Sequence, residues 1–293
     1  KLQKKILIIG SNGFIGQNLC IYLKKFFKVY ELNRNILKKN KKNISCDISK
    51  INELKKNFLK FPEFDYIINL SGQIEKDKLK MNNNVYVGNK NIIQTFKRTE
   101  STLVFFSTTL VYGHSKNYST EKSNLNPNSD YAKIKVKTEN LYRKMCKKFL
   151  ILRIGNVYDN QLSKKGLLKN LIKAIKNDTI FTVNKMKTVR NYVHIEDLIR
   201  VIKIIIDRKI TNKALNIGHQ NISNEKVIQM VEKIFKKKIK TKNLNKSYSL
   251  DPNIKINSNL IKKKFNYKFK NNIENSIKLN KWKKNILKIR KYL

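Results

Sequence analysis

The chain of 293 residues is poor in residues that bend or cross-link a backbone, with 3 prolines, 9 glycines and 3 cysteines. The cysteines, Cys20, Cys46 and Cys146, are odd in number and far apart, and no pair has metal-site spacing. The 3 histidines are isolated from one another. We therefore expect reduced thiols, ordinary histidines, no disulfide framework and no metal.

Long hydrophobic runs are also missing. No stretch approaches the ~20 apolar residues that span a bilayer. The first apolar run, at residues 6–9, is shorter than the roughly 7–15 residues of a secretory h-region, and no small-residue cleavage site follows it. We expect a protein that has no membrane segment and works in the cytoplasm.

Acidic residues are scarce: 20 Asp and Glu face 65 Lys and Arg, for a net charge of +45. The lysines are spread from end to end, and arginine, which suits bidentate phosphate contacts, is rare. The excess of Lys with Asn and Ile is typical of A/T-rich codons. We therefore expect no nucleic-acid role, although the charge would attract a doubly anionic small substrate.

What the chain does contain is an alternation of short apolar runs and helix-like stretches. Near-continuous apolar strands between helices favour a parallel sheet covered on both faces, that is, an α/β doubly wound sheet. Beyond residue 156 the alternation loosens, which indicates a smaller C-terminal lobe. We predict a large domain of residues 1–155 with a return segment near 190–217, and a small lobe of 156–189 and 218–293. The expected strands of the sheet are residues 6–9, 28–32, 43–46, 66–70, 103–107, 149–154 and 214–217.

Gly10, Gly13 and Gly16 stand between the first expected strand and the first expected helix. In this position Gly10 would make the turn, Gly13 would let the backbone approach a pyrophosphate, and Gly16 would let helix and strand pack closely. The helix N-terminus would then face the anion. The spacing predicts dinucleotide binding, and a structural turn is the alternative.

The end of the second expected strand bears on the choice of dinucleotide. An acidic residue there favours NAD, whereas a nearby arginine accommodates the 2′-phosphate of NADP. Glu31 lies one step too early, and Asn33 and Arg34 stand at the tip. NAD and NADP both remain open, and Asn33-Arg34 favours NADP.

Tyr131 and Lys135 are four residues apart, so they share one face of the expected helix at residues 129–148. A nearby lysine ammonium and the positive nicotinamide lower the pKa of a tyrosine, which then serves as general acid or base. Ser107, Thr108 and Thr109 stand at the C-terminal end of the fifth expected strand, the sheet edge where such folds bind ligands. A hydroxyl among them could hold a substrate oxygen beside the tyrosine.

Eight segments together resemble the extended short-chain dehydrogenase/reductases, in the NAD-dependent epimerase/dehydratase family that modifies nucleotide sugars. The resemblance covers nearly the whole chain and implies a Rossmann sheet with a smaller C-terminal substrate-binding lobe. In chain order the segments are GSNGFIG (10–16), DI (47–48), NLSG (69–72), STTLVYG (107–113), YAKIK (131–135), LRIGNVY (152–158), RNYVHIED (190–197) and LNIG (215–218).

The resemblance assigns a role to each matched position. Thr108, Tyr131 and Lys135 would be catalytic, and Thr108, Asn156 and Arg190 would contact a nucleotide-sugar substrate. A homodimer through two helices per subunit, one of them carrying Tyr131, is also implied. Together with Asn33 and Arg34, the expected cofactor contacts are Gly10, Gly13, Phe14, Ile15, Gly16, Asp47, Ile48, Leu70, Ser71, Gly72, Tyr131 and Lys135.

Departures from the family pattern narrow the reaction. Thr109 and Leu110 stand where the dehydratases carry Asp-Glu, so we expect no dehydration. Val85 replaces the usual Asn three residues before Gly88, and Asp159 replaces a Gly. No match to the late Arg-Pro-Gly-Asp segment is found, so the nucleotide base is open.

Two hypotheses follow from these residues. The first is a nucleotide-sugar 4-epimerase or 4-ketoreductase, between which the shared active-site residues do not decide. The second is a non-catalytic family member that binds RNA or a protein, which only the charge supports.

Overall fold

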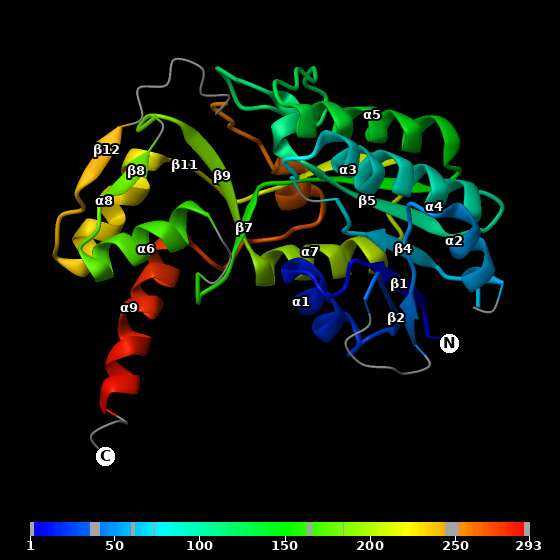
Figure 1. The fold of residues 1–293 in the computed structure, drawn as a ribbon, viewed down its shortest axis with the longest axis horizontal. Coiled ribbons are helices and arrows are strands. Elements are labelled where there is room, and N and C mark those ends of the chain that lie inside the picture. Colours follow the sequence, from blue (N-terminus) through cyan, green and yellow to red (C-terminus); the bar gives the residue numbers. More distant parts are fainter. Residues whose placement is uncertain are drawn as a thin grey trace.

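The centre of the computed structural model, which describes residues 3–35, 42–59, 62–72, 74–162, 166–183, 185–243 and 252–289, is a seven-stranded sheet. All its neighbouring strands run parallel, in the order β10-β6-β5-β4-β1-β2-β3 (Figure 1). The seven strands predicted above are these seven, which confirms the doubly wound α/β class. They are β1 (Lys5–Ile9), β2 (Lys28–Asn33), β3 (Asn43–Ser45), β4 (Tyr66–Asn69), β5 (Thr102–Thr108), β6 (Phe149–Ile154) and β10 (Lys213–Ile217).

Helices cover both faces of this sheet (Figure 1). On one face α1 (Phe14–Leu23) and α7 (Ile195–Asp207) pack against alternate side chains of the strands. On the other face lie α2 (Ile51–Phe58), α4 (Gly88–Phe96) and α5 (Asp130–Met145). Because both faces are covered, strands β4 (YIIN) and β6 (FLILRI) are buried along their whole length, which explains why all but one residue of each is aliphatic or aromatic.

A second, smaller group of elements lies beside the large sheet and includes two short sheets (Figure 1). Its helices α6, α8 and α9 share an apolar core with strands β8 and β9. The pattern analysis did not predict these strands, which are three to six residues long and lie where the alternation of apolar strands and helices loosens. The elements are β7 (Asn156–Tyr158), α6 (Leu167–Asn177), β8 (Phe181–Val183), β9 (Val189–His194), β11 (Gln220–Ser223), α8 (Asn224–Phe235), β12 (Thr241–Asn243) and α9 (Ile273–Ile289).

Four short helical turns complete the described chain, and one of them bears on the division into lobes. Ile261, Phe265 and Tyr267 pack into the core of the large sheet, although the sequence division placed them in the small lobe. The short elements are α3 (Lys78–Asn82), the π-helix η1 (Asn83–Val87), the 3₁₀-helix η2 (Thr109–Tyr112) and the π-helix η3 (Leu260–Lys264).

The sheet order brings the carboxyl ends of the strands to one edge. Strand β1 lies between β2 and β4, so the chain turns in opposite directions on its two sides, and such a switch point opens a crevice for ligands. Thr108 at the end of β5 is the register partner of Ile154, two residues before Asn156. Within the described residues, no helix combines the length and the apolar character needed to cross a membrane.

Candidate active site

The glycine-rich loop connects β1 to α1 in a compact turn. Gly10 has φ +81°, a conformation that glycine adopts readily, and its N–H donates to the Leu32 carbonyl at 2.8 Å. A Cβ on Gly16 would lie 2.7 Å from Cα of Ser11 and closer still to the Gly10 carbonyl oxygen. Gly13 is the N-cap of α1, so the first turn of the helix begins at the loop. The loop therefore presents the N-terminus of α1 at the sheet edge.

A cavity of about 350 Å³ opens at this loop. It is bordered by the carboxyl ends of β1 to β4, so residues far apart in sequence share its wall. Sequence reasoning missed Asn12, Asn35, Cys46, Glu75 and Asn84, of which Asn12 lies between the first two glycines. Nine of the expected cofactor contacts line this cavity: Gly10, Gly13, Asn33, Arg34, Asp47, Ile48, Leu70, Ser71 and Gly72.

Phe14, Ile15 and Gly16 do not line the cavity. Phe14 and Ile15 are partly buried and pack against the core beneath α1. They form the first turn of the helix, where backbone N–H groups lack intrahelical acceptors. Any cofactor contact from these residues would therefore involve the backbone, because their side chains face the core.

At the tip of β2, Asn33 and Arg34 differ in what they can offer a ligand. Asn33 Oδ1 accepts from the Asn12 N–H at 3.0 Å, and Asn33 Nδ2 donates to Ser11 Oγ at 2.5 Å. Asn33 thus holds the glycine loop to β2, whereas the Arg34 side chain is exposed at the cavity rim. Glu31 lies within β2 and pairs with Lys24 at 2.5 Å, and it does not line the cavity.

The expected catalytic residues lie at the end of β5 and the start of α5. Thr108 caps η2 by accepting the Leu110 N–H at 3.2 Å. The Tyr131 hydroxyl donates to the Gly72 carbonyl at 3.4 Å, so Tyr131 lies against the cavity wall. Lys135 donates to the Phe106 carbonyl at 2.8 Å and lies 5.4 Å from the centre of the Tyr131 ring.

Burial shifts the pKa values of Tyr131 and Lys135 in the ligand-free chain. It raises the pKa of Tyr131 above its ordinary value, whereas the lowered pKa expected from the sequence includes the charge of a bound nicotinamide. Burial also lowers the pKa of Lys135 to about 7, and nearby Glu139 acts against that lowering. Without a ligand, the site therefore favours the neutral phenol and weakens the charge of the lysine.

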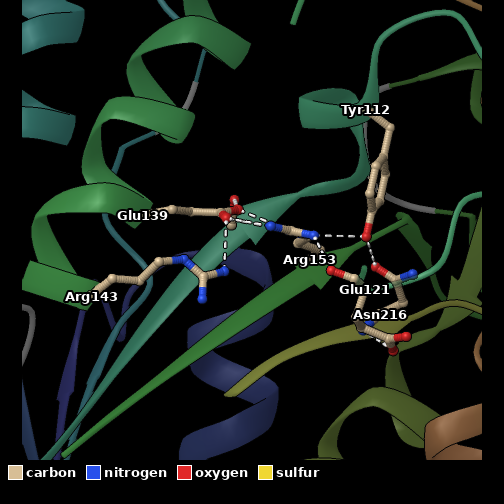
Figure 2. Close-up of polar contacts among 7 residues, drawn as sticks. Tyr112, Glu121, Glu139, Arg143, Arg153 and Asn216 are labelled. Atoms are coloured by element: carbon tan, nitrogen blue, oxygen red, sulfur yellow. Dashed lines mark hydrogen bonds and ion pairs between the residues drawn. The ribbon is translucent and has the colours of Figure 1, made fainter. Parts of the chain in front are cut away.

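A buried polar network that the sequence did not predict lies beside these residues (Figure 2). Glu139, one turn after Lys135, accepts from Ser107 Oγ at 2.6 Å and from Arg153 Nη2 at 2.7 Å. Arg153 Nη1 also donates to the Tyr112 hydroxyl at 2.9 Å. Burial is the largest single influence on Arg153 and would lower its pKa, but the hydrogen bonds and charge of Glu139 together with Tyr112 raise that pKa overall.

The network continues from Tyr112 to β10. The Tyr112 hydroxyl donates to Asn216 Oδ1 at 2.6 Å, and the Asn216 N–H donates to Glu121 Oε1 at 2.9 Å (Figure 2). It therefore ties together the ends of β5, β6 and β10, which lie beside the residues expected to react. Charged residues in apolar strands, such as Arg153 in β6, were the signal that could have revealed it.

A second cavity, of about 390 Å³, is lined by Asn156 and Arg190, the two expected substrate contacts other than Thr108. Asn156 is exposed and donates to the Asn191 carbonyl at 3.0 Å. Arg190 is half-buried, and burial lowers its pKa. Aromatic side chains, including Tyr158, Phe181 and Tyr192, also line this cavity. A partly apolar cavity with one arginine suits an anionic ligand that carries a ring.

Other residues of the recognised segments have structural roles. His194 Nδ1 accepts the Glu196 N–H at 3.3 Å and caps α7. The buried Asp197 accepts from the Tyr267 hydroxyl at 2.7 Å and from the backbone of Lys270 at 3.0 Å.

Cys20 and Cys46 are buried free thiols whose pKa values are raised by burial, to about 12 and about 11. In the part of the chain that the structure describes, no group of His, Cys, Asp or Glu side chains could hold a metal ion.

The doubly wound sheet, the glycine loop at its switch point and the Tyr-Lys pair beside it define a dinucleotide-dependent enzyme of the Rossmann class. The family model of the NAD dependent epimerase/dehydratase family matches residues 6–218. The chain belongs to this family.

Individual relatives agree with this assignment. The chain is similar to a dTDP-D-glucose 4,6-dehydratase of Dictyostelium discoideum, with 28% identity over 266 residues. The match covers 78% of this chain but only 61% of that relative. The structure resembles a UDP-glucuronic acid 4-epimerase of Bacillus cereus, solved with UDP-glucuronic acid and NAD, with a TM-score of 0.83, 23% identity and coverage of 96% and 99% of the two chains. It also resembles a UDP-glucose 4-epimerase of Thermotoga maritima, solved with UDP-glucose, with a TM-score of 0.81, 20% identity and coverage of 97% and 99%.

Proposed function

We propose that this chain is an NAD(P)-dependent nucleotide-sugar 4-epimerase or 4-ketoreductase. The observation that carries the proposal is the position of Tyr131, whose hydroxyl touches the wall of the 350 Å³ cavity at Gly72. The position of Thr108 also supports the proposal. Thr108 ends β5 and is the register partner of Ile154, which ends β6 two residues before Asn156 in the second cavity. A dinucleotide in the first cavity and a nucleotide sugar in the second would meet at these hydroxyls.

The residues of the first cavity fit a dinucleotide. Gly13 leaves room at the start of α1, where the nearest atom to an added Cβ would be the Gly10 oxygen at 3.4 Å. The N–H groups of the first turn would hold a pyrophosphate, and the carboxyl ends of β2 and β3 would hold the adenosine. When bound, the dinucleotide would supply or accept the hydride.

Tyr131 would move the proton of the sugar hydroxyl as hydride is exchanged at the same carbon. Thr108 would hydrogen-bond that oxygen and hold it near the phenol. Lys135 would hold a ribose hydroxyl of the dinucleotide, and its charge would make the phenol more acidic. Asn156 and Arg190 would hold the diphosphate and the nucleotide.

Dehydration is not part of this proposal, although one relative is named as a dehydratase. Elimination of water needs a group that moves a second proton. At the two positions after Thr108, Thr109 is buried and Leu110 packs against an apolar cluster that includes Val111 and Ile256. Neither side chain can serve as that acid or base.

The choice of dinucleotide, the oligomeric state and the location are further parts of the proposal. Arg34 at the cavity rim favours NADP, whereas the similar Bacillus cereus structure, solved with NAD, and the family description favour NAD. A homodimer is proposed from the family resemblance, and a cytoplasmic location from the sequence. The sugar and the nucleotide base are not assigned.

The experiment that tests the proposal is to identify the nucleotide released when the purified chain is denatured. About one tightly held NAD per chain would indicate a recycled cofactor and hence an epimerase. An empty site that binds added NADPH would indicate a reductase. Binding of neither dinucleotide would refute the proposal and favour the non-catalytic alternative, for which salt-dependent RNA binding is the next assay.

The chemical step needs its own assay. The chain would be incubated with UDP-glucose or UDP-glucuronic acid and the products separated by chromatography. Tyr131→Phe should abolish turnover of any accepted sugar and retain dinucleotide binding. Full turnover in that variant would exclude Tyr131 as the acid or base.

A further inference from the structure

Asn191, in β9, lies against the ends of two strands of the large sheet. It is only 1% exposed. Gly155 follows β6 and Gly218 follows β10, and a Cβ added to either glycine would overlap Oδ1 of Asn191. The carboxamide therefore fills the space that the two glycines leave between the large sheet and β9.

The hydrogen bonds of the neighbouring Asn221 fix which way this carboxamide points. Asn221 Nδ2 donates to the Ile256 carbonyl at 3.0 Å, and Asn221 Oδ1 accepts the Ile256 N–H at 3.0 Å, so its amide cannot turn round without losing both bonds. The same Oδ1 accepts from Asn191 Nδ2 at 3.0 Å. Asn191 Oδ1 consequently faces the two glycines, and it is buried with no hydrogen-bond partner among the residues that the structure describes. A buried acceptor without a donor lowers stability and is rare in folded proteins, which points to a role other than stability.

The main chain of Asn191 reaches the 390 Å³ cavity. Its carbonyl accepts at 3.0 Å from Nδ2 of Asn156, an exposed side chain that lines this cavity together with Arg190. Turning the Asn156 carboxamide round would bring its Oδ1 against the Asn191 carbonyl, and two acceptors do not bond. The carbonyl therefore fixes the position of the Asn156 nitrogen and leaves its second N–H for a ligand.

We propose that Asn191 is a positioning residue of the nucleotide-sugar site, whose anchored side chain holds its carbonyl so that Asn156 directs an N–H at the diphosphate. The inference rests on the proposed function, which places a nucleotide sugar in this cavity. The anchor runs from Ile256 through Asn221 to Asn191, and the Asn191 carbonyl passes the constraint to Asn156. Asn191 does not itself line the cavity, so it would act through Asn156.

The test is a double-mutant cycle, read by isothermal titration of UDP, dTDP, GDP and CDP after any bound nucleotide has been removed. With the best-bound of these probes, Asn156→Ala and Asn191→Ala should each weaken binding by about 3- to 10-fold, the value of one hydrogen bond. In the Asn156→Ala chain, the further change Asn191→Ala should weaken binding by less than about twofold, because the residue through which Asn191 acts is gone. The affinity for NAD or NADP, whichever binds better, should be the same in all four chains.

A general loss of stability is separated by a matched control. Asn91, in α4, is also buried, and its Nδ2 donates to the Ile48 carbonyl at 2.9 Å. Asn91→Ala should lower the melting temperature, as Asn191→Ala should, but leave the affinity for the nucleoside diphosphate unchanged. If Asn191→Ala does not fold, Asn221→Ala, which releases the anchor from outside, takes its place in the cycle with the same expected result.

An Asn191→Ala chain that binds the probe as the wild type does overturns the inference and leaves the proposed function intact. Losses that simply multiply in the double variant, that extend to the dinucleotide, or that Asn91→Ala matches, overturn it too. A wild-type chain that binds none of the four nucleoside diphosphates overturns both.

Discussion

Replacing Lys135 by methionine should stabilise the folded chain at neutral pH and alter how its stability depends on pH. Lys135 is buried, and burial lowers its pKa from 10.5 to about 7. Below pH 7 the ammonium is charged in both the folded and the unfolded chain. Between pH 7 and 10.5 the unfolded chain holds a proton that the folded chain has released, so the free energy of unfolding rises with pH in that window.

The size of the effect follows from the same pKa difference. Well above the folded pKa each pH unit contributes about 1.4 kcal/mol, and at pH 7 itself the slope is about half of that, so wild type should gain about 2 kcal/mol from this lysine between pH 7 and 9. Methionine does not titrate, and it can keep the packing of the lysine stem over the Phe105 ring, whose centre is 4.7 Å from Nζ. It loses the bond to the Phe106 carbonyl, which costs about 1 kcal/mol at every pH.

The assay is urea unfolding of both chains from pH 6 to pH 9. Other titrating groups are shared, so they cancel in the difference between Lys135→Met and wild type. That difference should favour the variant most at pH 6 and shrink by about 2 kcal/mol between pH 7 and 9. Lys133→Met, at an exposed position on the same helix, is the control and should show a constant difference. A difference for Lys135→Met that stays constant from pH 6 to 9 would refute the reasoning.

Four further substitutions, one of which is a control, test other parts of the structure. Gly16→Ala should lower both the urea midpoint and the dinucleotide affinity, because its Cβ would press on the Gly10 backbone, and normal binding by a stable variant would contradict this. Glu139→Gln should cost about 3–5 kcal/mol in urea unfolding, because Arg153 is left buried without its carboxylate. Glu100→Gln, which removes only exposed pairs, should change little, and equal losses would contradict the importance of burial. Arg34→Ser should weaken NADP about tenfold more than NAD by titration, whereas equal weakening would remove the basis for a preference for NADP.

The fold of the large domain could be predicted because its strands are buried on both faces. Every position of strands β4 and β6 is buried, and nearly all are aliphatic or aromatic. Few folds other than a parallel sheet covered on both faces bury such runs between helices. The strands of the smaller group could not be predicted in this way. Strand β8, for example, has three residues with a buried, exposed, buried pattern, which many loops share.

The cofactor side of the site could be predicted for a related reason. Parallel strands end at one edge, so Gly10, Arg34 and Asp47 had to converge once their strands were placed in one sheet. Asn84 could not be placed, because it lies in the π-helix η1, which has no sequence signal. The pairing of Glu139 with Arg153 likewise depends on how α5 packs across β5 and β6.

The electrostatics of the trio link the fold to the proposed chemistry. Burial raises the pKa of Tyr131 and lowers the pKa of Lys135, and in both cases it favours the neutral form of the side chain. Glu139 acts against this for Lys135, and the bonds from Ser107 and Arg153 hold its carboxylate in place. In the chain without ligands, burial therefore sets the pKa of the phenol and favours its protonated form. Under the proposed function, the positive charge of a bound nicotinamide would act in the opposite direction and lower that pKa.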